Sequence, residues 1–364
     1  MSATPSFAEI TTRLAARNVP LHALFEITER CNYACTHCYL PHRDDAELST
    51  EEALRVIDQL ADAGTMFLTI TGGEIFLRRD VWEIAERARD RELVTRFFTN
   101  GYLVDEEKAD RLAALNPIGV EISLYAPDAE GFERVTQVPG SFARTTRAIR
   151  LLAERGLRVV AKTPVMTVNA RRLAETRALA LALGADFQFD VVVSPMDGGE
   201  PAPFALRPGT GELEAALRFA KSITPASDVP PTGKPLDSAP CNAGRASVAI
   251  SPRGEVYPCV AIKVPAGSLR EKSLSEIWYG DASILAQLRG ITVASLSVCS
   301  TCEDRPWCPR CAGVARHEDG GLDLPSREAC RIAAARRAVD EGRPIPAEPP
   351  PRGPKTHHAL PILS

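Results

Sequence analysis

Residues 31–38 read Cys31-Asn-Tyr-Ala-Cys35-Thr-His-Cys38 and directly follow an apolar, strand-like segment. Three thiolates this close together can bind three irons of a four-iron cluster, which normally takes four cysteine ligands. The remaining iron then lacks a protein ligand and is open to a substrate or a cofactor. Zinc is the alternative, because His37 offers a fourth ligand beside the three thiols. Taken alone, the spacing leaves both interpretations open.

The composition of the 364-residue chain is that of a globular protein, with 45% hydrophobic and 25% charged residues. The formal net charge of −4 gives no reason to expect nucleic acid as a partner. The N-terminus lacks the features of a signal peptide, and no apolar run is long enough to cross a membrane. We therefore expect a cytoplasmic protein with no membrane partner, whose reduced cysteines bind metal rather than form disulfides.

Between residues 22 and 193, short apolar segments alternate with helical patterns. Such alternation is typical of a parallel sheet with helical crossovers, and six units can form an open or partial barrel. Ligands of such sheets bind at the carboxyl ends of the strands. The expected strands are Ala23–Thr28, Met66–Thr71, Val94–Thr99, Gly119–Leu124, Arg158–Val165 and Asp186–Val193. The expected helices are Thr50–Ala63, Asp80–Arg89, Glu106–Ala114, Ser141–Glu154 and Ala170–Leu183.

The chain is predicted to divide into an N-terminal segment, a barrel, a linker, a cysteine-rich module and a tail. The linker is rich in Pro and Gly and holds one expected helix at Glu212–Ser222. The module is expected to open with a hairpin of Ser247–Ile250 and Glu255–Tyr257. The tail, Pro-rich from residue 342, is expected to be disordered. The five parts are residues 1–20, 21–194, 195–240, 241–335 and 336–364.

A glycine-rich motif, Gly72-Gly73-Glu74, ends the second expected strand. Two glycines let a ligand approach the backbone closely, and the Glu74 carboxylate can receive an ammonium group. A simple glycine turn is the alternative. The motif gains weight because it lies one strand after the cysteine loop.

The fourth expected strand has a polar face, because Glu121, Ser123 and Tyr125 alternate with apolar residues. If the apolar face packs on helices, the polar face lines the barrel, where a purely structural core would favour branched apolar side chains. The pattern favours a wet or occupied barrel interior, with an ordinary hydrogen-bonded polar pair as the alternative.

Together these motifs resemble the radical S-adenosylmethionine (SAM) enzymes, which carry three cysteines at this spacing after the first strand and Gly-Gly-Glu-Pro after the second. Ile75 replaces the usual Pro, and His37 replaces the aromatic residue of many members. The resemblance covers residues 22 to about 193 and leaves zinc a remote option. It implies an α/β fold with a partial (β/α)6 TIM-like barrel.

By this resemblance, the first [4Fe-4S] cluster is bound by Cys31, Cys35 and Cys38, and its open iron is chelated by SAM. An electron donor such as flavodoxin or ferredoxin reduces the cluster. Cleavage of SAM then gives a 5′-deoxyadenosyl radical that takes hydrogen from the substrate. The cofactor thus supplies the reactive species, and the protein binds and orients it.

The resemblance also implies which residues contact SAM. Glu74, with the glycine backbone before it, would hold the methionine ammonium. Ser123 and Arg144 would contact the methionine carboxylate or the ribose, with Arg134 competing with Arg144 for that role. The implied contacts are Gly72, Gly73, Glu74, Asn100, Ser123 and Arg144.

Seven further cysteines lie between residues 241 and 330. Two Cys-x-x-Cys pairs fit a zinc ribbon, but the loop between them is short and one zinc leaves three cysteines unexplained. The arrangement resembles the SPASM extension of radical SAM enzymes, in which Gly254 precedes Cys259 by five residues. It implies a small cysteine-rich domain, with a β-hairpin and short helices, that binds two auxiliary [4Fe-4S] clusters.

The implied auxiliary ligands form two sets. The first set has only three cysteines, so a non-cysteine ligand completes it or one iron stays open to substrate. The sets are Cys241, Cys259 and Cys311 for the first cluster, and Cys299, Cys302, Cys308 and Cys330 for the second.

Members with this extension mostly modify peptides or proteins, so we expect maturation of a ribosomally made peptide. About twenty residues precede the first expected strand, and a separate leader-peptide-binding protein is therefore an expected partner. Tetrapyrrole (heme) side-chain modification, on a small-molecule substrate, is the runner-up. Sulfatase-type maturation is less favoured because the segment Tyr125-Ala-Pro-Asp128 departs from the Ser-Leu-Asp-Gly form of those members. A hypothesis outside the enzymes is that the chain is a non-catalytic Fe–S or zinc protein.

Candidate acids and bases toward the substrate lie near the expected strand ends. A structural role is the more common one for such residues. The candidates are Tyr125, Asp128, Lys162 and Asp190.

Overall fold

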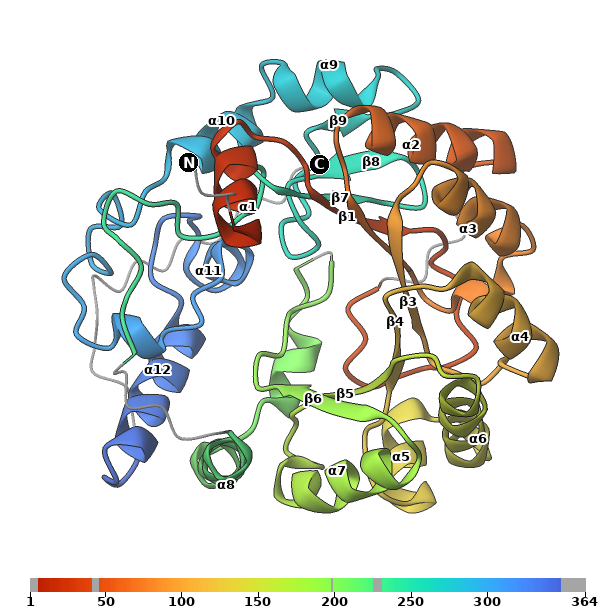
Figure 1. Cartoon of the computed structure of the whole chain (residues 1–364). Coiled ribbons are helices and arrows are strands. Elements are labelled where there is room, and N and C mark those ends of the chain that lie inside the picture. The colour runs from red at the N-terminus through yellow and green to blue at the C-terminus, as the bar shows by residue number, and fades with distance from the viewer. Residues whose placement is uncertain (1–5, 41–45, 198, 225–230, 348–364) are drawn as a thin grey trace, which may run out of the picture.

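The computed structural model describes residues 6–40, 46–197, 199–224 and 231–347. Within these residues the core is a nine-stranded sheet with the order β6-β5-β4-β3-β2-β1-β7-β8-β9. All neighbours from β6 to β7 are parallel, and the last two pairs are antiparallel. The sheet curves into an incomplete barrel with helices on its outer face (Figure 1). The predicted partial TIM-like barrel is confirmed.

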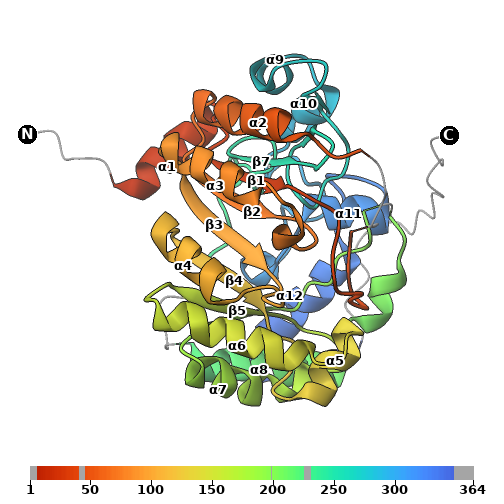
Figure 2. The same ribbon diagram turned by 90° about the vertical axis from the view of Figure 1, so that its right-hand side faces the viewer.

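The barrel strands and helices alternate as the sequence predicts. Figure 2 shows the helices layered along the outer face of the strands. The strands are β1 (His22–Glu26), β2 (Phe67–Thr71), β3 (Val94–Thr99), β4 (Gly119–Ser123), β5 (Val159–Pro164) and β6 (Asp186–Asp190). The helices are α2 (Thr50–Asp62), α3 (Val81–Asp90), α4 (Glu106–Leu115), α5 (Ala129–Thr136), α6 (Ser141–Glu154) and α7 (Leu173–Ala182).

Helix α2 illustrates how the local sequence builds this layer. Ser49 Oγ accepts a hydrogen bond from the Glu52 backbone N–H at 3.2 Å, and Glu52 Oε2 accepts one from the Ser49 N–H at 2.8 Å. This reciprocal cap satisfies two N–H groups that the helix itself cannot pair. One face of the helix then buries four apolar side chains against the sheet, those of Ala53, Val56, Ile57 and Leu60.

The structure adds two helices to the predicted elements and ends several elements, such as the last barrel strand, at other residues than predicted. Helix α1 (Phe7–Ala16) is an additional element that begins with the same cap, between Ser6 and Glu9. Helix α5 is also additional, and Asp128 caps it. Strand β6 ends at Asp190 instead of Val193, because its pairing with β5 stops there.

The cysteine-rich module continues the barrel sheet rather than folding apart from it. Strand β7 pairs parallel with β1, and the predicted hairpin of β7 and β8 is confirmed. Helices α11 and α12 lie opposite the barrel strands, on the open side of the curved sheet (Figure 1). The elements are β7 (Ser247–Ile250), β8 (Glu255–Tyr257), β9 (Gly267–Ser268), α9 (Leu274–Tyr279), α10 (Ser283–Gly290), α11 (Ala312–Asp319) and α12 (Arg327–Asp340).

The predicted tail begins too early. Helix α12 continues past residue 335 because Ala338 and Val339 are buried, and Val339 belongs to an apolar cluster shared with the linker helix α8 (Thr210–Ile223). Lys221 Nζ donates to the carbonyl oxygens of Val339 and Asp340 at 3.0 Å, which satisfies the end of the helix. Residues 348–364 of the predicted tail lie outside the described residues.

Candidate active site

The Gly72-Gly73-Glu74 segment packs directly on the backbone that leads into the cysteine loop. The Gly73 and Glu74 N–H groups donate to the carbonyl oxygens of Thr28 and Arg30, both at 2.8 Å. A Cβ on Gly72, whose φ is +146°, would lie 2.2 Å from Thr28 O, and one on Gly73 would lie 2.4 Å from Arg30 O. The glycines therefore admit the protein's own backbone, which fixes the cysteine loop at the carboxyl end of β2.

Glu74 is fully buried and ties the end of β2 to the end of β3. Both carboxylate oxygens accept the Thr99 hydroxyl at 2.8 Å, Oε2 also accepts the Asn100 N–H at 2.8 Å, and Oε1 accepts the Phe76 N–H at 3.1 Å. Burial raises the pKa of Glu74, while these hydrogen bonds act in the opposite direction. In this structure Glu74 positions the strand ends, and its contact with an ammonium group stays a prediction.

Three donors approach the sulfur atoms of the cysteine loop. The Tyr33 N–H lies 3.4 Å from Cys31 Sγ, and Asn100 Nδ2 lies 3.8 Å from the same sulfur. The Tyr125 hydroxyl lies 3.7 Å from Cys35 Sγ. Two residues predicted for SAM or substrate, Asn100 and Tyr125, thus contact cysteine sulfurs.

The thiols of this loop are strongly shielded from water. Burial, together with the neighbouring thiolates of the loop, raises the pKa of Cys35 to about 12 and that of Cys38 to about 11. Such thiols lose their protons when a metal cation binds, because the cation replaces the missing solvation. The loop therefore fits a buried metal cluster.

Four cysteines of the second module line one cavity, as its resemblance to the SPASM extension implies. Burial, together with the nearby thiolates of Cys299 and Cys302, raises the pKa of Cys308 to about 11. The remaining lining is largely apolar, which suits an iron–sulfur cluster shielded from solvent. The four cysteines are Cys299, Cys302, Cys308 and Cys330.

The other three cysteines also come together. Burial raises the pKa of Cys259 to about 12, with the thiolates of Cys311 and Cys241 adding to the effect. Among the described residues, no three His, Cys, Asp or Glu side chains lie close enough to share a single metal ion. The fit to clusters rests on the three groupings of partly buried thiols.

The two arginines that compete for one predicted role lie in different surroundings. Arg134 pairs with Glu130 at 2.6 Å, and both side chains are exposed. The Arg144 guanidinium lies over the Tyr102 ring, 5.0 Å from its centroid, and that ring packs edge-on against Tyr33 of the cysteine loop. The structure thus places Arg144 beside the loop through Tyr102. The carbonyl oxygens of Val135 and Thr136, directly after Arg134, also accept hydrogen bonds from the loop, so both arginines stay candidates.

The remaining candidates have structural partners. Asp128 accepts the Gly131 N–H at 2.9 Å as the cap of α5, and it also pairs with Arg172. Asp190 accepts the Val192 N–H at 2.9 Å where β6 ends. Ser123 and Lys162 face each other across β4 and β5. Asp128 and Asp190 thus have the structural role that sequence analysis considered the more common one.

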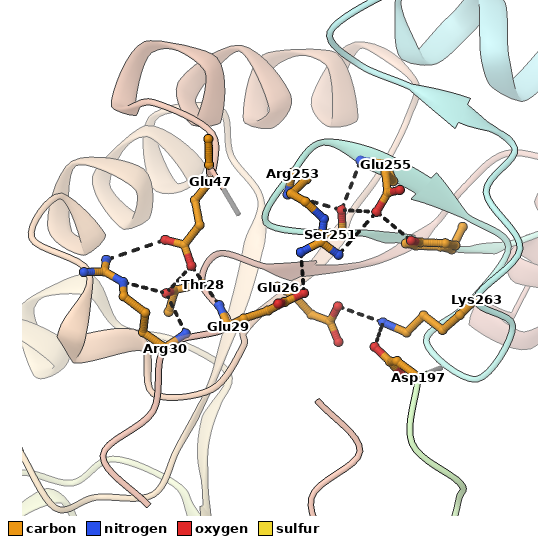
Figure 3. A network of polar contacts seen from close by, with 12 residues as sticks. Glu26, Thr28, Glu29, Arg30, Glu47, Asp197, Ser251, Arg253, Glu255 and Lys263 are labelled. Carbon is orange, nitrogen blue, oxygen red and sulfur yellow. Dashed lines mark hydrogen bonds and ion pairs between the residues drawn. The ribbon is translucent and has the colours of Figure 1, made fainter. Parts of the chain in front are cut away.

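Sequence analysis missed a buried charge cluster at the contact between barrel and module (Figure 3). Lys263 Nζ lies 2.8 Å from Glu26 Oε2 and 3.0 Å from Asp197 Oδ2, and Tyr39 donates its hydroxyl proton to Glu26 at 3.1 Å. Glu26 and Asp197 hold the pKa of Lys263 above its ordinary value although burial lowers it. Glu26 could have been found as a carboxylate on a strand of otherwise apolar residues.

This cluster borders a cavity. Several residues of its wall come shortly after a cysteine in the sequence, in the barrel or in the module. Tyr39 adjoins Cys38, and Ala261 lies two residues after Cys259. Val314 of α11 lies three residues after Cys311 and forms another part of the wall. The cavity is therefore lined by residues from both halves that are close in sequence to Cys38, Cys259 and Cys311.

A second contact fixes the module against the barrel. Arg253, in the turn between β7 and β8, donates to Glu29 Oε1 at 2.7 Å, and only 4% of the Glu29 side chain is exposed (Figure 3). Glu47 Oε1 accepts from the Thr28 hydroxyl at 2.7 Å and from the Glu29 N–H at 2.9 Å. These contacts hold the segment between β1 and Cys31.

Both halves match known families. Residues 25–180 match the radical SAM superfamily, and residues 241–311 match SPASM, an iron–sulfur cluster-binding domain. A PqqA peptide cyclase of Granulibacter bethesdensis is 30% identical over 88% of this chain and 90% of that protein. This chain belongs to the radical SAM superfamily. It is an enzyme with a SPASM domain that uses SAM and [4Fe-4S] clusters, and three clusters are typical of SPASM enzymes.

Other relatives of this radical SAM enzyme act on different substrates. The mycofactocin maturase MftC of Mycobacterium ulcerans is 30% identical over 85% of this chain and 88% of that protein. An AdoMet-dependent heme synthase of Methanosarcina barkeri is 27% identical over 83% of this chain and 94% of that protein.

Two solved structures share the fold of this radical SAM enzyme. Streptococcus suis SuiB bound to SAM matches with a TM-score of 0.67 and 17% identity, over 89% of this chain and 83% of SuiB. AnSMEcpe, bound to AdoMet and a peptide, matches with a TM-score of 0.66 and 14% identity, over 89% of this chain and 97% of that chain. None of the helices in the described part of the chain has the length and apolar character needed to span a membrane.

Proposed function

We propose that this radical SAM enzyme modifies a ribosomally made peptide in the cytoplasm, where its cysteines stay reduced. The observation that carries the proposal is the cavity at the contact between barrel and module, which is lined by Tyr39 beside Cys38 and by Ala261 and Val314 of the module. A substrate in this cavity would contact segments that are close in sequence to ligands of the SAM-binding cluster and of the first auxiliary cluster. The similarity to a peptide cyclase and a maturase over most of the chain supports a peptide as the substrate.

The cluster ligands in this proposal are the three groups of partly buried thiols. Cys31, Cys35 and Cys38 would hold the SAM-binding cluster. The auxiliary clusters would be held by Cys241, Cys259 and Cys311, and by Cys299, Cys302, Cys308 and Cys330. When bound, SAM and its cluster supply the radical that removes a hydrogen atom from the substrate.

The protein's own groups bind, orient and exclude water. Ser123 and Arg144 would hold the methionine carboxylate or the ribose, and the Gly72–Glu74 segment would hold the ammonium. At the cavity wall, Lys263 and Asp197 offer a buried ammonium and a carboxylate to the polar backbone of a peptide, and Glu26 behind them holds Lys263 in place. Because these charges are desolvated, they orient a bound substrate more strongly than exposed charges would.

The proposal includes two protein partners. A one-electron donor such as flavodoxin or ferredoxin would reduce the first cluster. A separate leader-peptide-binding protein would deliver the precursor peptide to the cavity.

A second candidate function is tetrapyrrole side-chain modification. The heme synthase of Methanosarcina barkeri favours it, since that relative matches 83% of this chain. In this case the substrate would be a small molecule and no leader-binding partner would be needed.

The test uses anaerobically reconstituted protein with SAM and dithionite. We expect release of 5′-deoxyadenosine, and its absence would contradict radical SAM chemistry in this chain. A short peptide encoded beside the gene is then added with its leader, and its mass is measured. A mass change that depends on SAM supports the peptide substrate. No change in the peptide, together with SAM-dependent modification of a carboxylated iron porphyrin, would overturn it in favour of the second candidate.

A further inference from the structure

A second cavity lies on the interior face of the barrel, over β3 to β6. Val120 and Ile122 of β4 are fully buried toward the helices, so Glu121 between them faces the interior. The strand register places Glu121 one interior row above Arg96 of β3 and one row below Lys162 of β5. All three residues line the cavity.

Two cations share one carboxylate in this cavity. Arg96 Nη1 lies 3.2 Å from Glu121 Oε1, and Lys162 Nζ lies 3.2 Å from Glu121 Oε2. Lys162 Nζ also donates to the neutral amide oxygen of Gln188 at 2.8 Å. The three ionised groups therefore leave one positive charge in excess.

Another arginine at the rim does not change this balance. Arg158 pairs with Asp186 at 3.2 Å, and both side chains are more than half exposed. The excess charge therefore comes from the inner group of Arg96, Glu121 and Lys162.

The side chains of Arg96 and Lys162 have N–H donors that remain accessible in the cavity. Only 7% of the Glu121 side chain is exposed, whereas 40% of Arg96 and 42% of Lys162 remain accessible. A guanidinium has five N–H donors in a planar fork that fits a carboxylate. Among the described residues, the Arg96 side chain makes no hydrogen bond or ion pair other than its contact with Glu121. Unused donors therefore remain beside the cavity, and the buried carboxylate keeps the two cations in place.

We propose that this cavity binds a carboxylate of the substrate, with Arg96 and Lys162 as its receptors and Glu121 as their positioning residue. The inference rests on the proposed function and narrows it to substrates that carry a carboxylate. For a peptide, the group is an acidic side chain or the C-terminal carboxylate. The neutral amide isostere is rejected, because it leaves the excess positive charge unpaired.

The test measures binding of two pairs of small probes to the reconstituted holoenzyme by isothermal titration. N-acetylglutamate methylamide represents an acidic side chain, and N-acetylglutamine methylamide is its neutral isostere. N-acetyltyrosine represents a C-terminal carboxylate, and its amide is the matching control. We expect one or both of the carboxylates to bind about tenfold more tightly than the neutral partner, as charged hydrogen bonds require. Equal binding of both pairs would overturn the proposal.

Two variants and a matched control locate the site. Arg96→Gln and Lys162→Met should each weaken the carboxylate about tenfold and leave the neutral probe unchanged, whereas Arg96→Lys should restore part of the preference. Arg111→Gln is the control, because Arg111 lies outside the barrel over the Trp82 ring. If both Arg96→Gln and Lys162→Met still bind the carboxylate probe more tightly than the neutral probe, the receptor lies elsewhere and the proposal is overturned. Melting temperatures that match the wild type would show that the variants lose binding and not folding. If Arg96→Gln does not fold, Arg96→Lys takes its place.

A third arm separates this inference from the rest of the mechanism. If Arg96 and Lys162 serve the methionine carboxylate of SAM, added SAM displaces the probe and their variants weaken SAM binding, which would overturn the proposal. Formation of 5′-deoxyadenosine without substrate reports on the radical chemistry alone. If it is absent in every variant, the proposed function fails; if it persists while the probes bind without charge preference, only the carboxylate site fails.

Discussion

The hydroxyl oxygen of Tyr125 lies 3.7 Å from the Sγ of Cys35, just beyond the carboxyl end of β4. Burial raises the pKa of Tyr125 well above its ordinary value, so the side chain keeps its proton. A thiolate that binds iron has no proton to give, and the hydroxyl is therefore the donor. Hydrogen bonds to the sulfurs favour the more negative, reduced state of an iron–sulfur cluster.

Replacing Tyr125 with Phe should therefore lower the reduction potential of the first cluster. We expect a fall of about 40 mV, the equivalent of one net hydrogen bond of about 1 kcal/mol for a one-electron couple. The measurement is a redox titration of the first cluster, followed by electron paramagnetic resonance. Tyr279→Phe is the matched control, because Tyr279 is 51% exposed on α9. An unchanged potential in Tyr125→Phe would show that the hydroxyl does not donate to the sulfur.

The close packing of Gly73 on the cysteine loop gives a second prediction. In Gly73→Ala, the new methyl group would lie 2.4 Å from Arg30 O, so the backbone must move. We expect a loss of about 1–3 kcal/mol of stability from overpacking, together with weaker retention of the first cluster. Apparent melting temperature and iron content measure both effects. Gly290→Ala is the control, since a Cβ there meets no atom within 4 Å; equal behaviour of the two variants would contradict the prediction.

The sequence predicted the barrel because its signals are local. Strand alternation, helix periodicity and the spacing of Cys31, Cys35 and Cys38 can each be read within a few residues. The cap of Ser6 and Glu9 was an equally local signal for α1, and it was overlooked. The grouping of the seven later cysteines came from a family resemblance, and the partly buried thiol groups of the structure agree with it.

The Lys263 cluster could not be predicted in the same way. Glu26 and Lys263 are 237 positions apart, and their contact exists only because β7 pairs with β1 and brings the module to the barrel edge. Asp197 comes from a third segment, after β6. Nothing in the sequence around one of these residues specifies the other two, so only the folded structure reveals the cavity that they border.

The three groups of thiols should hold their iron independently. Replacing Cys31, Cys35 and Cys38 with Ala should lower the iron content from about twelve to about eight per chain and abolish cleavage of SAM. The comparison variant replaces Cys299, Cys302 and Cys308 with Ala. It should lose about the same amount of iron, because it removes one four-iron cluster, but keep the formation of 5′-deoxyadenosine. Iron analysis and chromatography measure the two outcomes; loss of all iron from either variant would contradict separate sites.

Asp197 gives a prediction on pH. Burial raises its pKa from an ordinary value near 3.8 to about 6, although Lys263 lowers it. A carboxyl whose pKa is higher in the folded state contributes stability that is present below its unfolded pKa and is lost as the pH rises to the folded pKa. The wild type should therefore lose roughly 3 kcal/mol relative to Asp197→Asn between about pH 4 and pH 6, and little more above that range.

Two measurements check this behaviour. The infrared carbonyl band of a protonated carboxyl should disappear in the wild type with a midpoint near pH 6, and that component should be missing from Asp197→Asn. The difference in melting temperature between the two proteins should change over the same range, in favour of the variant at higher pH. Asp237→Asn is the control, because Asp237 is exposed in the linker and should leave the band in place. A midpoint near 4 in the wild type would mean that Lys263 outweighs burial, so that Asp197 faces the cavity as a carboxylate throughout the physiological range.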